Sequence, residues 1–398
     1  MEEKIQLMNR EAQNRLENVD QHLANIHIGD AATINKILKS KKADRTIEKL
    51  EGTTSPDEMT NIVEQHFRQQ LSQGENIDSG TIIEDYMTEK ALKDDKEISL
   101  TEVRNAIKKL KGSPGPDNIP HEFYKELIDI LAVILLELYK KNKIIPKRAN
   151  ISRTILIQKK GRHKELIKSY RPITLTNFDL KILASIINDR LQQSIKHIIC
   201  PNQTAYIKGR SGDHNIVVAR DAIEHIKKNQ IQASIIQLDL EKAFDSVNHK
   251  TLFQILEHID TPHFIKANIK NLYTNLHTRI EVNQEQTKGI KVNQGVKQCC
   301  PLSSTLFILF INILIKLLEE ATTTKGITIH DTKIKILAYA DDITIVNTEK
   351  NHYQLLDTLT LFTQNMGLKF NKDKCTVYDL DRDPITPFKQ IHELNILE

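Results

Sequence analysis

The alternation of apolar and polar residues predicts a β-hairpin near residue 340. The apolar stretches Ile336–Ala338 and Ile343–Val346 are each long enough for a strand, and the pair Asp341–Asp342 lies between them. Two carboxylates about 4 Å apart repel each other by roughly 4 kcal/mol at an effective dielectric constant of about 20. A pair held against an apolar core therefore needs water or a divalent cation, although Asp is also common in simple polar turns.

A second apolar strand, Ser234–Leu238, also ends at a carboxylate, that of Asp239. Phe244 and Asp245 follow where a helix is expected to begin, with Asp245 on the N-cap side of the turn. Asp239 can therefore join the pair as a third carboxylate. Two-metal phosphoryl transfer needs carboxylates that hold two cations about 3.5–4 Å apart, and carboxylate oxygens suit magnesium.

The residues before Ser99 are polar and are predicted to be mostly helical. An apolar stripe with spacings of three and four residues predicts a helix lying on the body of the protein, with a short coiled coil as the alternative. The stripe consists of Ile5, Met8, Ala12, Leu16, Val19, Leu23 and Ile26. Segments 52–57 and 72–74 are expected to be loops between helices.

Further along, the pattern predicts two helices and a strand. Ser99 and Glu102 form a capping-box pattern that starts a helix, and this helix is expected to end at Gly112. The residues 155–157 predict a strand. The next helix after Gly112 is predicted from one apolar face, which consists of Phe123, Leu127, Leu131, Leu135 and Leu138.

The longest apolar run, Leu306–Leu318, is interrupted by Asn312 and Lys316. It is too short to span a bilayer, which takes about 20 residues, so we expect a buried helix and no membrane partner. Four cysteines without zinc-ligand spacing, two of them adjacent, indicate a reducing intracellular compartment.

Charge is distributed unevenly along the chain. The net charge of the 398 residues is only +4, but the segment from Arg104 to Arg171 contains 17 Lys and Arg against 6 Asp and Glu. A basic surface of this kind suits a polyanion held by its phosphate backbone, which predicts a nucleic-acid partner. Some of these lysines are also expected simply to coat helix faces or to interact with helix C-termini.

Seven segments of the chain have a distinctive composition and order. They are Ser113–Lys125, Ser169–Asn177, Asn202–Ser211, Asp239–Asp245, Gly295–Ser303, Tyr339–Asp342 and Gly367–Lys374. In this order they resemble the motifs of the reverse transcriptase domain of non-long-terminal-repeat retrotransposons, the long interspersed element type. The resemblance extends from about Ser99 to about Lys374, and it departs from the family pattern at Cys299, where the family has Gly. A Cys side chain is expected to hinder the close backbone approach that Gly allows.

The resemblance implies a role for each of eight residues. Asp239, Asp341 and Asp342 would be the catalytic, metal-binding carboxylates, holding two Mg²⁺ ions with Mn²⁺ as a substitute. Phe244 would be the steric gate under the sugar of the incoming nucleotide. The alternative for Phe244 is a core aromatic residue at the turn from strand to helix. Four more residues would contact the nucleotide or its phosphates, and these are Lys159, Arg171, Gln298 and Lys374. Surface charge is the alternative for Lys159 and Arg171.

The resemblance also implies an α+β right-hand polymerase with fingers and palm, in which helices flank an antiparallel palm sheet. The expected divisions are 1–98, a helical N-terminal extension; 99–230, fingers; 231–378, palm; and 379–398, the truncated start of a thumb. The expected function is RNA-directed DNA polymerase, with an RNA template, a DNA primer and deoxynucleoside triphosphates as partners.

Two alternatives remain open at this stage. Only 24 residues follow Lys374, so we expect a truncated copy, and a decayed fragment that retains only nucleic-acid binding is one alternative. A maturase similar to those of group II introns is the other.

Overall fold

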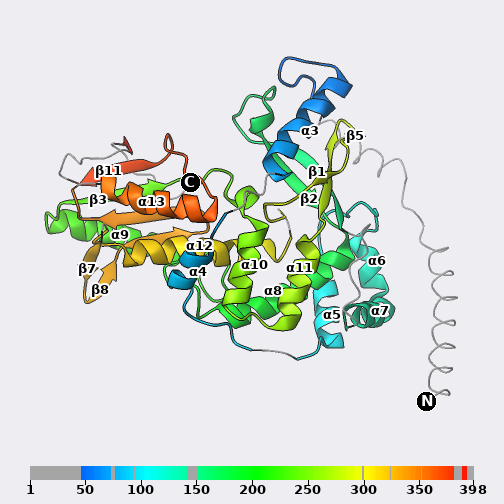
Figure 1. Ribbon diagram of the computed structural model, residues 1–398, viewed down its shortest axis with the longest axis horizontal. Coiled ribbons are helices and arrows are strands. Elements are labelled where there is room, and N and C mark those ends of the chain that lie inside the picture. Colours follow the sequence, from blue (N-terminus) through cyan, green and yellow to red (C-terminus); the bar gives the residue numbers. More distant parts are fainter. Residues whose placement is uncertain are drawn as a thin grey trace.

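The computed structural model describes residues 46–72, 77–93, 96–140, 150–297, 300–322, 324–350, 352–380 and 388–391. The apolar stripe expected between Ile5 and Ile26 lies outside these residues. Figure 1 shows a mixture of helices and strands, with two larger sheets at different places in the molecule. None of the helices in the described ranges is long and apolar enough to cross a membrane.

The described helices are α3 (Pro56–Ser72), α4 (Gly80–Tyr86), α5 (Leu100–Lys108), α6 (His121–Glu126), α7 (Ile128–Lys140), α8 (Phe178–Ile195), α9 (Gly212–Lys228), α10 (His249–His258), α11 (His263–Tyr273), α12 (Ser303–Glu320) and α13 (Tyr353–Met366), with the 3₁₀ turns η1 (Ile167–Ser169) and η2 (Ala243–Ser246). The described strands are β1 (Ile151–Gln158), β2 (Tyr170–Leu175), β3 (Ala233–Leu238), β4 (His277–Val282), β5 (Glu285–Gln286), β6 (Ile290–Lys291), β7 (Ile327–Ile329), β8 (Thr332–Ile334), β9 (Ile336–Tyr339), β10 (Asp342–Asn347), β11 (Thr376–Leu380) and β12 (Lys389–Gln390).

One sheet has the strand order β2-β1-β4-β5, with β6 also paired to β4. Strand β1 is antiparallel to β2 and parallel to β4, although about 120 residues of sequence separate β1 from β4. Helix α3 packs on this sheet through Met59, Val63 and Phe67, which share an apolar cluster with Leu156 of β1 and Ile280 of β4. The helix and the sheet form the upper part of Figure 1.

The second sheet has the order β12-β11-β3-β10-β9, with β3 at its centre. Helix α12 contacts β9 of this sheet and is buried along most of its length, as the apolar run Leu306–Leu318 predicted. Its polar residue Asn312 is satisfied, because its side chain donates to the Ile198 carbonyl (3.1 Å) and accepts from the Cys200 amide (2.8 Å).

The capping box predicted at Ser99 is present, but the helix that it starts is shorter than expected. The Ser99 hydroxyl accepts from the Glu102 amide (3.2 Å), and the Glu102 carboxylate accepts from the Ser99 amide (2.9 Å). Helix α5 ends at Lys108 rather than Gly112, since the Leu110 amide turns back to the carbonyl of Ile107, three residues earlier (3.0 Å).

The single helix expected to contain Phe123 and Leu138 is instead two helices, α6 and α7. Leu127 separates them, with a φ of −97° and a ψ of 25°. This break changes the phase of the helix, so Phe123 and Leu138 are 39% and 47% exposed. The buried face of α7 is made by Ala132, Leu135 and Tyr139.

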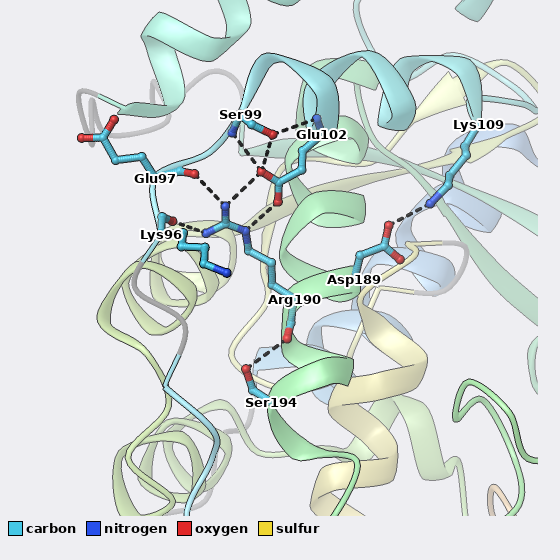
Figure 2. A network of polar contacts seen from close by, with 8 residues as sticks. All are labelled: Lys96, Glu97, Ser99, Glu102, Lys109, Asp189, Arg190 and Ser194. Carbon is cyan, nitrogen blue, oxygen red and sulfur yellow. Dashed lines mark hydrogen bonds and ion pairs between the residues drawn. The ribbon is translucent and has the colours of Figure 1, made fainter.

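A buried arginine fixes the start of α5 to α8. Arg190 is 5% exposed, and its guanidinium donates to the Glu102 carboxylate at 2.7 and 3.0 Å and to the Glu97 carbonyl at 2.9 Å. Figure 2 shows that the Lys96 carbonyl and Ser99 complete this network. Burial alone would raise the pKa of Glu102, but hydrogen bonds from Arg190 and Ser99 lower it to about 2.

We predict that Glu102→Gln destabilises the protein by about 1–3 kcal/mol at pH 7, because a buried guanidinium loses its charged acceptor. The folded-state pKa is below the usual value of 4.5, so the stabilisation is present above pH 4.5 and is lost as pH falls toward about 2. Urea unfolding at pH 7 and at pH 3 measures this effect. The difference in the free energy of unfolding between Glu102→Gln and wild type should be smaller at pH 3.

Asp189→Asn is the matched control, because Asp189 forms an exposed ion pair with Lys109 (2.8 Å). Figure 2 shows this pair beside the network. This variant should lose less than about 1 kcal/mol. An equal loss in both variants, or a gap that does not change with pH, would contradict the assigned role of Glu102.

Candidate active site

The pairing of β3 with β10 brings the predicted carboxylates to one end of the second sheet. The two strands are antiparallel, and Leu238 lies opposite Ile343. Asp239 directly follows β3, and Asp342 is the first residue of β10. Asp341 occupies the turn that joins β9 to β10, so the predicted hairpin is confirmed. Three carboxylates from two separate parts of the sequence therefore gather at neighbouring strand ends.

These carboxylates are close enough to influence one another's ionisation. Burial raises the pKa of Asp341, and the charge of Asp239 raises it further. Burial likewise raises the pKa of Asp342, followed by the charges of Asp341 and Asp239. Like charges in a partly desolvated environment make full ionisation of the three carboxylates unfavourable. A bound cation would offset this repulsion.

A cationic side chain lies against Asp239. The Lys374 ammonium is 3.4 Å from one Asp239 oxygen, and the Asn371 amide donates to the Asp239 carbonyl (2.9 Å). The motif that ends in Lys374 is thus held beside the strand end. Lys374, which the sequence predicted to be near the phosphates, is beside the carboxylates in this structure.

No three His, Cys, Asp or Glu side chains in the described ranges are gathered closely enough to hold a metal ion as they stand. The donor chemistry nevertheless fits a divalent cation, since Asp239, Asp341 and Asp342 offer only hard oxygen ligands. Their mutual charge effects also give a reason for a cation to bind between them.

Gln203 holds the hairpin turn and was not singled out by the sequence analysis. Its side chain is fully buried, accepts from the Ala340 amide (2.9 Å) and donates to the Ala340 carbonyl (3.1 Å). The neighbouring Thr204 amide donates to the Ala338 carbonyl of β9 (3.0 Å). Gln203 therefore fixes the residue that precedes Asp341. The motif Asn202–Ser211 contained the signal, but the sequence did not reveal its target 137 residues away.

Two exposed aromatic residues lie beside the carboxylates. The ring centroids of Tyr206 and Tyr339 are 6.3 Å apart. The backbone has a positive φ at Tyr206 (+55°) and at Ala340 (+56°), which is unusual for residues other than Gly. Gly212 allows this packing, because a Cβ there would lie 2.9 Å from the Tyr339 ring. Burial raises the pKa of Tyr206, as do the nearby charges of Tyr339, Asp341 and Asp342.

Phe244 lies in the 3₁₀ turn η2 rather than at the start of a helix. The helix expected near Asp245 begins at His249, because the Asn248 side chain caps it by accepting from the amides of the second and third residues after it. The Phe244 ring stacks on Phe307 with centroids 4.3 Å apart and an angle of 17°. One face of Phe244 therefore packs on the core, as a core aromatic would, while the side chain remains partly exposed.

The segment that leads to Gln298 packs against the η2 turn. The Gly295 amide donates to the Val247 carbonyl and the Val296 amide to the Phe244 carbonyl, both at 2.8 Å. Gly295 has a φ of +89°, and a Cβ there would lie 2.9 Å from the Asp245 carbonyl oxygen. Gln298 and Cys299 themselves lie outside the described residues, so their expected roles stay predictions.

Two of the predicted cations, Lys159 and Arg171, lie next to or on the first sheet. Lys159 follows β1, and its ammonium donates to the Lys168 carbonyl (3.0 Å). Burial lowers the pKa of Lys159, and the charges of Arg171, Arg162, Lys242 and Lys374 lower it further. Arg171 lies on β2 opposite Ile157 and is exposed. Lys159 is therefore within electrostatic range of both Arg171 on the first sheet and Lys374, which precedes β11 of the second.

We predict that Gln203→Leu releases the hairpin turn. Two hydrogen bonds to Ala340 are lost, each worth about 1 kcal/mol, so hydrogen exchange at the Ala340 amide should be at least about tenfold faster. Amide exchange followed by mass spectrometry or NMR measures this. Exchange at Ile235 and Ile345, in the paired strands β3 and β10, should stay slow. Unchanged exchange at Ala340 would mean that Gln203 does not hold the turn.

Comparison with known proteins gives consistent results. The family model for reverse transcriptase (RNA-dependent DNA polymerase) matches residues 157–390. The chain is 31% identical over 256 residues to the transposon TX1 uncharacterized 149 kDa protein of Xenopus laevis, covering 63% of this chain and 19% of that protein.

Two further relatives are retrovirus-related Pol polyproteins from R2 retrotransposable elements. The R2DM polyprotein of Drosophila melanogaster is 26% identical over 288 residues, covering 72% of this chain and 27% of its own length. The R2 polyprotein of Popillia japonica is 29% identical over 284 residues, covering 70% of this chain and 38% of its own length. The alignments thus include between about a fifth and two fifths of these relatives. The match to more than half of the chain shows that it belongs to the reverse transcriptase (RNA-dependent DNA polymerase) family, as its motifs predicted.

Proposed function

We propose that this chain adds deoxynucleotides to the 3′-hydroxyl of a DNA primer on an RNA template. The observation that carries the proposal is the register of β3 and β10, which brings Asp239, Asp341 and Asp342 to neighbouring strand ends. Membership of the reverse transcriptase family supports the reaction. The basic segment from Arg104 to Arg171 supports a nucleic-acid partner held by its backbone.

Asp239 and Asp341 would hold most of the ligand bonds to two Mg²⁺ ions, with Asp342 as the third carboxylate and Mn²⁺ as a substitute. Bound in this way, the metal would activate the primer hydroxyl and stabilise the charge that develops on the leaving phosphate. Lys374, whose ammonium lies 3.4 Å from an Asp239 oxygen, would neutralise the departing pyrophosphate.

Lys159 and Arg171 would bind the triphosphate from the side of the first sheet. Burial lowers the pKa of Lys159, and the charge of Arg171 lowers it further, so the two cations lie within electrostatic range. Phosphoryl transfer depends on positive charge of this kind at the leaving group. Gln298 would contact the incoming nucleotide and the template base, as the resemblance implies.

Phe244 would select the sugar. Its stacking on Phe307 fixes the ring from one side, so that the ring resists displacement by a 2′-hydroxyl. A deoxyribose fits against such a ring, whereas a ribose would collide with it.

We also propose the right-hand arrangement of the family. The sheet β2-β1-β4-β5 would belong to the fingers and the sheet β12-β11-β3-β10-β9 to the palm. The proposed ranges are 99–230 for the fingers and 231–378 for the palm, although strands β4, β5 and β6 of the second range belong to the first sheet. Helices before residue 99 would form the extension, and residues 379–398 the connection to a thumb.

We predict that Asp341→Asn abolishes Mg²⁺-dependent incorporation of dTTP on poly-rA primed with oligo-dT, with a loss of at least about 10³-fold, because a charged metal ligand is removed. Asp221→Asn, which changes an exposed carboxylate on α9, is the matched control and should keep full activity. Activity that persists in Asp341→Asn would refute the site. An inactive wild type that still binds the primed template would instead favour a protein that only binds nucleic acid.

We predict that Phe244→Val raises the use of ribonucleotides relative to deoxynucleotides by at least about tenfold, since a smaller side chain leaves room for a 2′-hydroxyl. The ratio of kcat/KM for UTP and dTTP measures this selectivity. Phe253→Val, at a partly buried aromatic residue of α10, should leave the ratio unchanged. An unchanged ratio in Phe244→Val would rule out Phe244 as the gate.

A further inference from the structure

The C-terminal end of α3 contacts the η2 turn through Gln70. The Gln70 side-chain oxygen accepts from the Lys242 ammonium (2.6 Å), and its side-chain nitrogen donates to the Asp245 carboxylate (3.2 Å). One neutral amide thus lies between a cation and an anion of the same turn. Because the amide accepts from Lys242 without carrying a negative charge, it fixes the position of the ammonium without neutralising it.

The backbone of Gln70 is itself held firmly. The Gln294 side chain donates to the Gln70 carbonyl (2.6 Å), and the Asn293 amide donates to the Leu71 carbonyl (2.8 Å). These bonds satisfy carbonyls at the end of α3 that have no partner within the helix. They also join α3 to the segment that leads into the Gly295 motif, so that one helix end is bonded to two segments of the site.

Lys242 lines a polar cavity and lies within electrostatic range of Lys159. Its own backbone has a φ of +47°, which is unusual for a residue other than Gly. Its charge lowers the pKa of Lys159, together with those of Arg171 and Lys374. A polar cavity of about 230 Å³, which Lys242 and Gln70 both line, adjoins the turn. Cations that repel one another in this way are stabilised by a polyanionic ligand.

We propose that Lys242 binds the triphosphate of the incoming deoxynucleotide and that Gln70 is the positioning residue for its ammonium group. This inference rests on the proposed function and assigns two residues that the motifs did not assign. It also makes α3, which precedes the family-matched residues 157–390, part of the nucleotide site. The Gln70 amide nitrogen bonds the Asp245 carboxylate, so the neutral Gln70 oxygen is the side-chain acceptor that holds the Lys242 ammonium in place.

The test measures the Kd of dTTP for the full chain bound to poly-rA and an oligo-dT primer with a dideoxy end, so that dTTP binds without being incorporated. Lys242→Ala should weaken binding at least about tenfold, as expected when a charged hydrogen bond is lost. Lys242→Arg should restore most of the affinity, because it keeps the charge. Gln70→Ala should weaken binding by several-fold, and Gln70→Glu more strongly, because a carboxylate would neutralise Lys242.

Asn61→Ala is the matched control, since Asn61 is an exposed amide side chain on α3 that does not line the cavity. It should keep the wild-type Kd. In steady-state extension with an ordinary primer, Lys242→Ala and Gln70→Ala should raise KM for dTTP while kcat stays within about threefold, a split that a folding defect would not produce.

The outcomes separate the two proposals. A wild type that incorporates dTTP, with Lys242→Ala and Gln70→Ala that keep its Kd, would overturn this inference and leave the polymerase function intact. A wild type that neither binds nor incorporates dTTP would overturn both. Equal losses in Asn61→Ala and Gln70→Ala would also overturn the inference, because they would indicate a general effect of the helix surface.

Discussion

The antiparallel pairing of β3 with β10 is the constraint on which the rest of the site depends. Because Leu238 lies opposite Ile343, Asp239 and Asp342 must lie at the same end of the sheet. A shift of one residue would turn every side chain of one strand to the opposite face and would separate the carboxylates. The apolar residues of both strands prevent that shift, since Ile236 and Ile345 are fully buried in the present register.

Contacts from distant segments hold the hairpin and its neighbouring carboxylate, and acidic and basic side chains come from different parts of the fold. Gln203 holds Ala340, and Lys374 lies 3.4 Å from Asp239. The acidic side chains belong to one sheet, whereas Lys159 and Arg171 belong to the other or follow it. A metal-bound nucleoside triphosphate carries both signs of charge, so it would satisfy the acids and the cations together.

Local patterns in the sequence predicted the parts of this fold that depend on local physics. The hairpin with Asp341 at its turn, the strand that ends before Asp239, the capping box at Ser99 and the buried helix around Asn312 were all predicted from spacing and residue type. Each of these depends on periodicity or on hydrogen bonds within a few residues.

The features that the sequence did not reveal depend on contacts between distant residues or on small backbone adjustments. Gln203 reaches Ala340 and Gln70 reaches Lys242 across more than 130 residues, and no periodicity encodes such a pair. The break at Leu127 and the start of α10 at His249 are local, but competing caps and tertiary packing decided them. Motif order therefore predicted the candidate site, while the contacts of Gln203 and Gln70 that hold its segments in place required the structure.

Anomalous X-ray scattering from Mn²⁺ tests the central claim most directly. Crystals of the full chain with a chain-terminated primer on an RNA template, dTTP and Mn²⁺ would show where the ions bind. The account predicts anomalous peaks in contact with the carboxylates of Asp239 and Asp341. Ions bound elsewhere, or a complex with ordered dTTP and no peak between these two residues, would contradict it.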